Sequence, residues 1–563
     1  MNVSITPDNV SEGLETVFLF LRNPTGGPVH GQRPDAVLLI FDKLRPDDDQ
    51  LMGSHGDDLM LGDDGFVDPL SDVATFVGGN GNDVLNGGAG FDALYGQDGN
   101  DRLEGGAGDD LLEGGTGNDV YVFDADTPVG IDMLNEIAGA INGLDTLDFS
   151  HTTGVAISVD LAIGGTAQDV STMGMSIYLR LTLSDGDAIE NLVGGGADDT
   201  LLGNALDNSL TGGPGSDWID GRSGTDQLAE SRNIDFVLTN AMLGVLALTE
   251  LDTLISIERI TLAGGSGDNR FDVSGWTGAP ASIDGRQGID TVISSNDGSF
   301  ILDDTTLTVA PGTTFLLESI ERAELTGGPG ANLFNATAFA GAAVLNGGAG
   351  NDVFLGGTGD SYYIFDTDTP QGHDTIADSS GSDTLDFSTT TALGVTVNLP
   401  SLGTGAPQPV NANLTLTLVG GAAIENVIGG SLNDTLTSNS LNNTLSGGAG
   451  DDTYVFNDTW GEDTIVEFAG QGTDTLDFST VANALAVSVA AILSVMEGVN
   501  SATHSDTNLE QVIGGLGDDT FTVTPSTTTA LFVDGGNGYD ILNLTATGGQ
   551  PVTDANFEEV HTP

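Results

Sequence analysis

The chain has 563 residues, 83 of them glycine, and its 83 acidic residues outnumber 12 Lys and Arg to give a formal charge of −71. Such self-repulsion opposes a compact state unless cations neutralise it, and the scarcity of basic residues argues against nucleic acid as a partner. The absence of cysteine excludes disulfides and thiolate metal sites, whereas a hydrophobic content of 38% is enough to build a core.

The first 45 residues differ from the rest of the chain. The segment SEGLETVFLFLRNPTGG (11–27) and the closing AVLLIFD (36–42) resemble the final strands of a Calx-β domain. The resemblance implies part of a β-sandwich over residues 1–45, so the chain looks like a fragment at this end. No basic region followed by a clean apolar stretch precedes it, and no classical signal peptide is predicted.

A nine-residue repeat fills Gly78 to Val122 without a gap, as GGNGNDVLN, GGAGFDALY, GQDGNDRLE, GGAGDDLLE and GGTGNDVYV. Each unit has aspartate at its sixth place and an apolar residue or tyrosine at its eighth. The glycines permit a tight turn over the first six residues, and the last three form a minimal strand with the eighth residue in the core. A related copy, GSHGDDLML, begins at Gly53.

Weaker copies of this unit follow along the chain. Blocks begin at Gly194 and Gly429, and single copies stand at Gly347, Gly514 and Gly535. Elsewhere the sixth place lacks a carboxylate, so a full metal site is not expected there; the residues concerned are Asn208, Asn269, Asn332, Ser361 and Asn443. For the degenerate copies, a metal-free coil with asparagine ladders remains an equal alternative.

Longer β-rich stretches separate the blocks. Three of them contain DTLDFS, at Asp145, Asp383 and Asp474, whose Leu and Phe are expected in the core. Their aspartates are expected to form turns or caps, with metal ligation as the less favoured alternative. A short acidic signal (IEN, IER or LEQ) precedes the next glycine turn. The apolar run 481–496 is shorter than the ~18 residues of a spanning helix and is predicted to be a buried strand.

The predicted organisation is all-β, with parallel β-roll or β-solenoid modules in tandem. The segments are 1–45 (Calx-β-like), 46–124 (first roll), 125–193 (β-rich intermodule), 194–263, 264–346 (degenerate), 347–428, 429–513 and 514–563. The last segment looks truncated, because NFEEV (556–560) resembles the signal that opens a module.

If successive units alternate between two sides of a flattened coil, Asp83 lies over Asp101, and Asp92 over Asp110. Strands in neighbouring layers are ~4.8 Å apart, so one cation can bridge the carboxylate of one turn and the carbonyls of the next. Calcium suits such a site, since it accepts six to eight oxygen ligands in forgiving geometry, whereas magnesium requires a strict octahedron. Zinc would need His or Cys ligands.

The unit G-G-x-G-x-D-x-U-x resembles the RTX, or haemolysin-type calcium-binding, family. The resemblance implies a parallel β-roll with several calcium ions between its turns, type I export from a Gram-negative cell, and folding outside that cell. It extends a ligand role to the sixth-place aspartates, which are Asp83, Asp92, Asp101, Asp110, Asp119, Asp199, Asp217, Asp226, Asp352, Asp434, Asp452, Asp519 and Asp540.

No catalytic motif is visible: H-E-x-x-H and G-x-S-x-G are absent, and no cysteine nucleophile exists. The leading hypothesis is a non-enzymatic, secreted or cell-surface protein that calcium folds and rigidifies as an adhesive or matrix structure. Its partners would be calcium, surface polysaccharide or further copies of itself. The alternative is a calcium-dependent polysaccharide-active enzyme or carbohydrate-binding region, with carboxylates and aromatics converging near Trp218, Trp276 or Trp460.

Overall fold

The computed structural model describes residues 49–52, 59–61, 74–136, 143–173, 176–245, 250–399, 405–419, 424–468, 470–490, 492–504, 509–525, 530–546 and 549–563. These residues form strands and turns and no helix, and the described part of the chain therefore contains no membrane-spanning helix. The Calx-β-like segment predicted over 1–45 lies outside the described residues.

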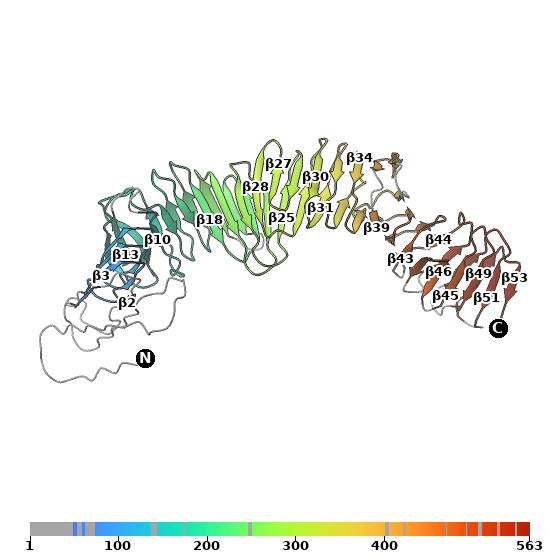
Figure 1. The fold of residues 1–563 in the computed structure, drawn as a ribbon, viewed down its shortest axis with the longest axis horizontal. Coiled ribbons are helices and arrows are strands. Elements are labelled where there is room, and N and C mark those ends of the chain that lie inside the picture. The colour runs from blue at the N-terminus through green and yellow to red at the C-terminus, as the bar shows by residue number, and fades with distance from the viewer. Residues whose placement is uncertain are drawn as a thin grey trace, which may run out of the picture. The chain divides into compact units, whose positions relative to one another are not determined.

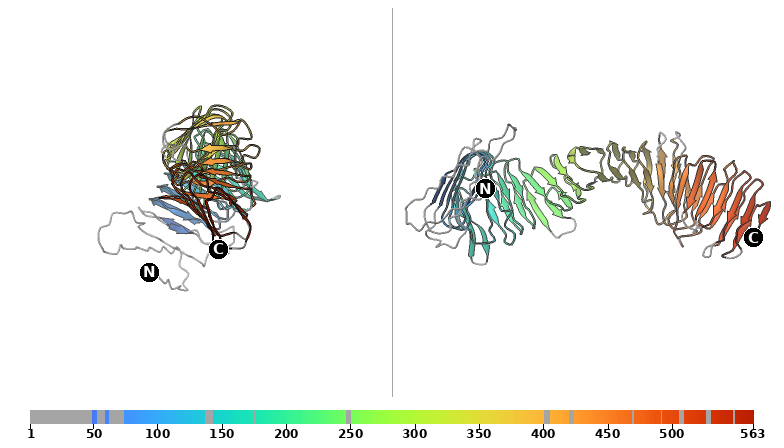
Figure 2. Two further views of the ribbon diagram at one scale, coloured as in Figure 1. Left: turned by 90° about the vertical axis from the view of Figure 1, so that its right-hand side faces the viewer. Right: turned by 60° about the horizontal axis from the view of Figure 1, so that its bottom comes forward.

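The chain folds as two compact units, Met1–Leu228 with Glu250–Ile257 and Ala229–Thr249 with Glu258–Pro563. Within each unit the strands are stacked side by side, as the labelled ribbons show (Figure 1). The views from two further sides show the same stacking in each unit (Figure 2). The finer division of the chain into eight segments stays a prediction.

The repeat block alternates between two parallel sheets, as its nine-residue period predicts. Leu94 pairs with Leu112 in one sheet, whereas Leu85 pairs with Leu103, and Leu103 with Tyr121, in the other. All five side chains are fully buried. Nonapeptides two places apart in the sequence are therefore neighbours in space. The predicted all-β parallel β-roll is confirmed.

The first unit contains three stacks of strands. In spatial order, they are β1 (Asp49–Met52), β3 (Ala74–Asn80), β5 (Ala93–Asp98), β7 (Leu111–Thr116), β9 (Gly130–Leu134), β13 (Ser176–Leu183) and β12 (Gln168–Met173); β2 (Leu59–Leu61), β4 (Val84–Asn86), β6 (Arg102–Glu104), β8 (Val120–Val122), β10 (Thr146–Asp148), β14 (Asn191–Val193), β16 (Ser209–Thr211) and β18 (Gln227–Ser231); and β11 (Ser158–Asp160), β15 (Thr200–Leu202), β17 (Trp218–Asp220) and β21 (Leu251–Ile255). All neighbours are parallel except β12 and β13.

The second unit repeats this arrangement. Its parallel stacks are β19 (Phe236–Thr239), β23 (Arg270–Gly275), β25 (Thr291–Ser295), β29 (Arg322–Thr326), β31 (Ala342–Asn346), β33 (Ser361–Ile364), β35 (Asp383–Asp386), β39 (Ile424–Ile428), β41 (Thr444–Ser446), β43 (Glu462–Val466) and β47 (Asn500–His504); β22 (Arg259–Ala263), β24 (Ala281–Asp284) and β28 (Thr313–Glu318); β26 (Phe300–Asp303), β30 (Leu333–Ala338), β32 (Val353–Leu355), β34 (Gly372–Ala377) and β38 (Leu414–Leu418); β36 (Thr396–Asn398), β40 (Thr435–Thr437), β42 (Thr453–Val455), β44 (Thr475–Asp477), β48 (Gln511–Ile513), β50 (Leu531–Asp534) and β52 (Val552–Ala555); and β45 (Ala486–Val489), β49 (Thr520–Val523), β51 (Ile541–Leu544) and β53 (Glu559–His561). Antiparallel insertions are β20 (Met242–Val245), β27 (Thr306–Val309), β37 (Gln408–Pro409) and β46 (Leu493–Glu497).

The apolar run 481–496 differs from its prediction. It forms two antiparallel strands, β45 and β46, instead of one buried strand. The other described strands of the second unit have two to six residues, so a single strand over the whole run would extend beyond its neighbours. The chain instead reverses direction, burying Val487 and Val495 while Ile492 is exposed.

The DTLDFS segments contribute to the core as expected. Leu147 and Phe149 are fully buried, and Phe149 stacks on Phe123 with ring centroids 5.4 Å apart. The same stacking joins Phe456 to Phe478 at 4.4 Å. Each DTLDFS segment thus forms the coil next to the tyrosine-containing nonapeptide that precedes it.

Candidate metal centres

The sixth-place aspartates form ladders along the edges of the coil. The backbone N–H of Asp83 donates to Oδ1 of Asp101 at 2.7 Å, and that of Asp101 donates to Oδ1 of Asp119 at 2.7 Å. On the other edge, the N–H of Asp92 donates to Oδ1 of Asp110 at 2.8 Å. We call each accepting carboxylate a rung. The stacking predicted from the period is therefore observed in the hydrogen bonds themselves.

The ladders continue beyond the nonapeptides. The N–H of Asp110 donates to Asp132 at 2.9 Å, and the N–H of Asp119 donates to Asp145 at 2.9 Å. Asp145, the first residue of DTLDFS, in turn donates its N–H to Glu190 of the IEN signal at 2.9 Å. The same sequence of donors recurs in the second unit, ending on Glu321, Glu425, Glu510 and Glu558. The acidic signal is thus the last rung of these five ladders, whereas the ladder through Asp92 and Asp110 reaches an aspartate, Asp132.

The favoured expectation, that the DTLDFS aspartates form turns or caps, is therefore not met by the first of each pair. Asp145, Asp383 and Asp474 are buried rungs. The second aspartate does form a turn, since Oδ1 of Asp148 accepts the N–H of Ser150 at 2.9 Å. The nine-residue period could not predict that the first aspartate is a rung. These rungs follow the residues that donate to them by 22 or 26 residues, whereas two nonapeptides span 18.

The predicted ligands fall into groups that differ in whether the carboxylate oxygen Oδ2 accepts a hydrogen bond. Within the described part of the chain, Oδ2 is buried and accepts no hydrogen bond in Asp110, Asp119, Asp352, Asp452 and Asp540. The same holds for rungs that the nonapeptide pattern missed, which are Asp132, Asp290, Asp374, Asp383 and Asp463. None of these ten carboxylates forms an ion pair with a described basic residue. A buried oxygen in this state needs a cation or a proton.

Three predicted ligands, Asp199, Asp434 and Asp519, are bonded differently. Oδ1 of Asp434 accepts the N–H of Val395 at 2.7 Å, and its Oδ2 accepts that of Gly430 at 2.5 Å. Asp199 and Asp519 repeat this pattern with their own neighbours. Main-chain donors therefore satisfy both oxygens of these carboxylates.

The remaining predicted ligands also take their places in the ladders. Asp217 and Asp226 are rungs, because they accept the N–H groups of Asp199 and Asn208 at 2.8 Å each. Together with Asp83, Asp92 and Asp101 they are buried. Every predicted ligand therefore lies on a ladder edge.

The first glycine of a nonapeptide leaves space for the carboxylate of the aspartate at the sixth place. A Cβ at Gly347 would lie 2.3 Å from Oδ2 of Asp352, and one at Gly447 would lie 2.2 Å from Oδ2 of Asp452. Any larger residue would displace the oxygen. The glycine-rich turn is thus fitted to the carboxylate as well as to the backbone.

The donor set consists of hard oxygen atoms, namely buried carboxylates beside the carbonyls of stacked turns, which suits calcium. Two family models match the chain: "RTX calcium-binding nonapeptide repeat (4 copies)" at residues 46–66, 77–112, 95–127, 193–228 and 326–362, and "Peptidase M10 serralysin C terminal" at 354–484. The chain is an RTX-type calcium-binding repeat protein. No curated protein matches it.

Burial makes the charged form of the ladder carboxylates unfavourable when no cation is bound. Burial raises the pKa of Asp110, Asp119 and Asp452 to about 6, and that of Asp132 and Asp145 to about 8. Removal from water disfavours the charged form, and the neighbouring carboxylates add repulsion. A cation bound at these positions would therefore compete with protons.

The sixth-place asparagines show how an RTX turn is completed without a cation. Nδ2 of Asn208 donates to the carbonyl of Glu190 at 3.1 Å and to Oδ1 of Asn204 at 3.0 Å. Nδ2 of Asn443 donates to the carbonyl of Glu425 at 3.1 Å. The amide group supplies protons where an aspartate would leave an unbonded oxygen, which favours the metal-free interpretation at these two positions.

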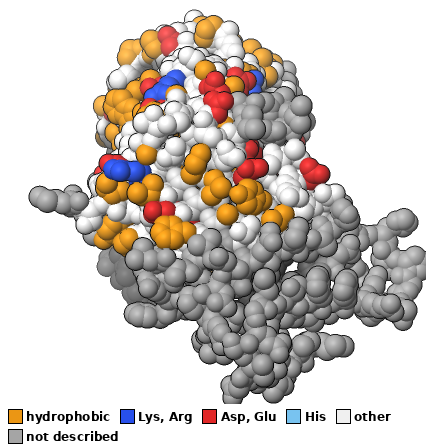
Figure 3. All heavy atoms as spheres, turned by 90° about the vertical axis from the view of Figure 1, so that its left-hand side faces the viewer, with side chains coloured by type: hydrophobic (Ala, Val, Ile, Leu, Met, Phe, Trp, Pro, Cys, Tyr) orange, Lys and Arg blue, Asp and Glu red, His pale blue; other side chains and the backbone are white. Residues whose placement is uncertain are grey.

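The surface offers little basic charge to offset the acids. On the face seen in Figure 3, acidic side chains lie among hydrophobic ones and basic side chains are few. The described ion pairs, such as Arg222 with Asp160 at 2.6 Å, are partly exposed. Pairs of this kind contribute little to stability and do not neutralise the buried ladders.

Proposed function

We propose that this RTX protein is a secreted or cell-surface scaffold, exported from a Gram-negative-type bacterium, whose calcium-filled turns fold and stiffen an adhesive or matrix structure. The observation that supports this most is the set of buried rungs whose Oδ2 has no hydrogen-bond partner among the described residues. Neutralising them gives calcium a direct role in stability, because its binding free energy becomes folding free energy.

The setting follows from the charge. A chain with a formal charge of −71 repels itself. Calcium that binds the folded state and not the unfolded one stabilises the fold in proportion to the logarithm of its concentration. Such a chain would remain unfolded in a low-calcium cytoplasm and fold in a calcium-rich exterior, which supports the secreted assignment.

The proposed calcium ligands are graded. The strongest are the rungs with an unbonded second oxygen, such as Asp110 and Asp352. The repeat-block aspartates Asp83, Asp92 and Asp101, together with Asp217 and Asp226, are proposed on their position in the ladder. For Asp199, Asp434 and Asp519, the carboxylates are satisfied by the main chain, and we propose a structural role before a ligand role.

The enzymatic alternative finds no specific support. It requires carboxylates and aromatics that converge in a cleft. Trp276 and Trp460 are buried, whereas Trp218 is 48% exposed. A cavity of about 350 Å³ beside Trp276 is lined by Ser274, Thr277 and Asn296 among others, and by no acidic residue. Both matched family models describe non-catalytic segments.

Circular dichroism during calcium titration tests the folding role. We expect β structure to form as calcium is added and to be lost in excess chelator; full β structure in chelator would contradict the proposal. Light scattering with and without calcium then separates a self-associating matrix protein from a monomeric adhesive module. Turnover or binding of alginate or pectin would instead favour the polysaccharide-active alternative.

A further inference from the structure

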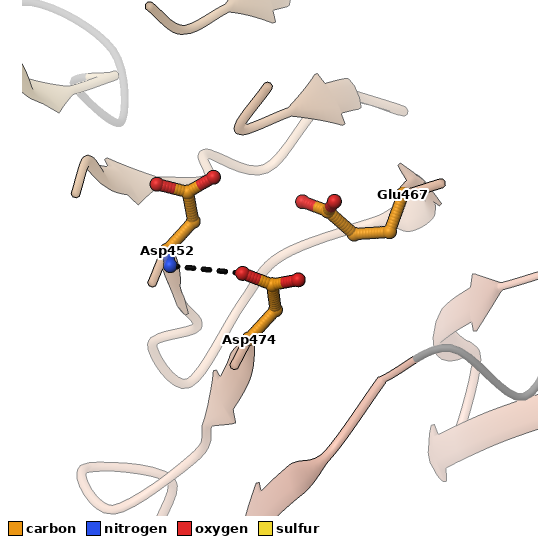
Figure 4. Close-up of side chains that lie close together, drawn as sticks. All are labelled: Asp452, Glu467 and Asp474. Atoms are coloured by element: carbon orange, nitrogen blue, oxygen red, sulfur yellow. Dashed lines mark hydrogen bonds between the residues drawn. The ribbon is translucent and has the colours of Figure 1, made fainter. Parts of the chain in front are cut away.

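Three carboxylates converge in the second unit at a place that the nonapeptide pattern does not account for. Asp452 and Asp474 are neighbouring rungs, since the N–H of Asp452 donates to Oδ1 of Asp474 at 2.9 Å. Glu467 follows β43 and is not a rung, yet its side chain points toward the two aspartates (Figure 4). One oxygen of each residue lies within 4.8 Å of the other two.

A tyrosine fixes the position of Glu467. The hydroxyl of Tyr454 donates to Oε1 of Glu467, and the same hydroxyl accepts the N–H of Gly447 at 2.6 Å. Tyr454 is fully buried at the eighth place of its nonapeptide. The glutamate is thereby held beside the ladder by one oxygen, which leaves the other directed at the aspartates.

Two oxygens in this cluster lack partners. Oε2 of Glu467 and Oδ2 of Asp452 accept no hydrogen bond among the described residues, although the two residues are only 4% and 1% exposed. No described Lys or Arg forms an ion pair with any of the three acids. A buried, unpaired carboxylate is costly to keep, so these oxygens need either a cation between them or a proton.

We propose that Asp452, Glu467 and Asp474 form a divalent-cation site of their own, which takes calcium between two rungs and a glutamate supplied from outside the repeating turn. Oxygen-only ligands of this kind suit a hard cation. Tyr454 is a positioning residue, because it contacts Glu467 and not the ion. Burial raises the pKa of Glu467 to about 7, as expected for a carboxylate that lacks its cation.

The same tyrosine–glutamate contact occurs in the first unit. The hydroxyl of Tyr121 donates to Oε1 of Glu136 and accepts the N–H of Gly114 at 2.7 Å. Among the described residues, however, only Asp452, Glu467 and Asp474 bring three carboxylate oxygens within 4.8 Å of one another. The cation site is therefore assigned to the second unit alone.

A third copy carries a natural substitution. The hydroxyl of Tyr363 donates to Asp378 at 2.6 Å, and Asp383 is the following rung. Ser361 stands where the other copies have aspartate. One carboxylate of three is missing, so this copy is expected to bind calcium more weakly than the site at Asp452, Glu467 and Asp474.

Glu467→Gln in the full chain tests the site, because Glu467 is a proposed ligand but not a rung. The measurement is hydrogen exchange by mass spectrometry of peptides spanning 447–456, in calcium and in chelator. We expect the variant to exchange at least tenfold faster than the parent chain in calcium. In chelator it should exchange more slowly than the parent, because the amide removes a buried charge and donates to the aspartates. The matched control is Glu462→Gln, an exposed acid on β43, which should change neither rate by more than twofold.

Two results of the Glu467→Gln experiment would overturn the proposed site. Unchanged calcium protection in Glu467→Gln overturns the site. Faster exchange in both buffers also overturns it, since Glu467 would then act only as the acceptor for Tyr454. The inference rests on calcium binding by the chain, and the peptides of residues 78–122 report on that independently. If calcium protects those peptides in the parent chain, a negative result at 447–456 concerns the carboxylate site alone.

Discussion

Replacing Asp110 by Asn should stabilise the first unit without calcium, and calcium should cancel or reverse that gain. Oδ1 of Asp110 accepts the N–H of Asp92 at 2.8 Å, and asparagine can accept the same bond. Oδ2 is buried without a hydrogen bond among the described residues, and an amide nitrogen would take its place. The substitution therefore keeps the rung and removes only the charge.

The magnitudes follow from the burial of the carboxylate. Its pKa rises from 3.8 to about 6, and at 1.36 kcal/mol per pKa unit the charged form costs about 3 kcal/mol near pH 8. In chelator the variant should therefore be more stable by about 1–3 kcal/mol. In calcium at a hundred times the dissociation constant, the parent gains about 2.7 kcal/mol that the variant does not. Because the variant keeps the gain that it shows in chelator, its net change in calcium is between about −2 and 0 kcal/mol.

Thermal melts followed by circular dichroism, in chelator and in calcium at pH 8, measure both effects. The matched control is Asp109→Asn, an exposed neighbour whose Oδ1 accepts the N–H of Ile131 at 2.9 Å, a bond that asparagine keeps. Its effect should stay within about 0.5 kcal/mol in both buffers. A fall in melting temperature of equal size in both buffers for Asp110→Asn would refute the ligand role of Oδ2.

Three further predictions concern the same ladders. Because burial raises the pKa of Asp132 and Asp145 to about 8, protonated carboxylates stabilise the metal-free fold at low pH, and this stability is lost as pH rises toward about 8. Circular dichroism in chelator should therefore show more β structure at pH 5 than at pH 8, and a flat profile would contradict the shifts. Gly347→Ala places a Cβ 2.3 Å from Oδ2 of Asp352 and should cost about 1–3 kcal/mol by denaturant unfolding in calcium; no loss would show that the turn has room to relax. Asp434→Asn should lower the melting temperature equally with and without calcium, through about 1–3 kcal/mol of lost main-chain bonding, and a calcium-specific loss would identify Asp434 as a ligand.

The sequence alone was sufficient to predict the coil and most of its chemistry. Each nonapeptide contains one turn and one strand. A strict nine-residue period therefore places the sixth residue of every second nonapeptide on the same edge of the coil. The stacking of Asp83, Asp101 and Asp119 follows directly and is observed. Burial of the eighth residues and the parallel β-roll follow from the same period. The ligand role of the individual aspartates stays a prediction.

Only the tertiary structure showed where the ladders continue. Asp145 accepts the N–H of Asp119 across 26 residues, and Glu190 accepts that of Asp145 across 45. The chain makes excursions of unequal length between these rungs, so no fixed period identifies them. Hydrogen bonding between layers depends on which strands stack, and that is decided by packing of the whole coil.

The convergence of Glu467 with Asp452 and Asp474 illustrates the same limit. The sequence marks Asp452 by its place in a nonapeptide and Asp474 by the recurring DTLDFS, but Glu467 has no motif. Its position depends on a hydrogen bond from Tyr454, a residue that the repeat pattern identifies only as core. The sequence by itself determined a periodic, acidic, calcium-binding coil. The fold decided which carboxylates meet, because a side chain outside the period reaches the ladder only through the path of the backbone between its coils.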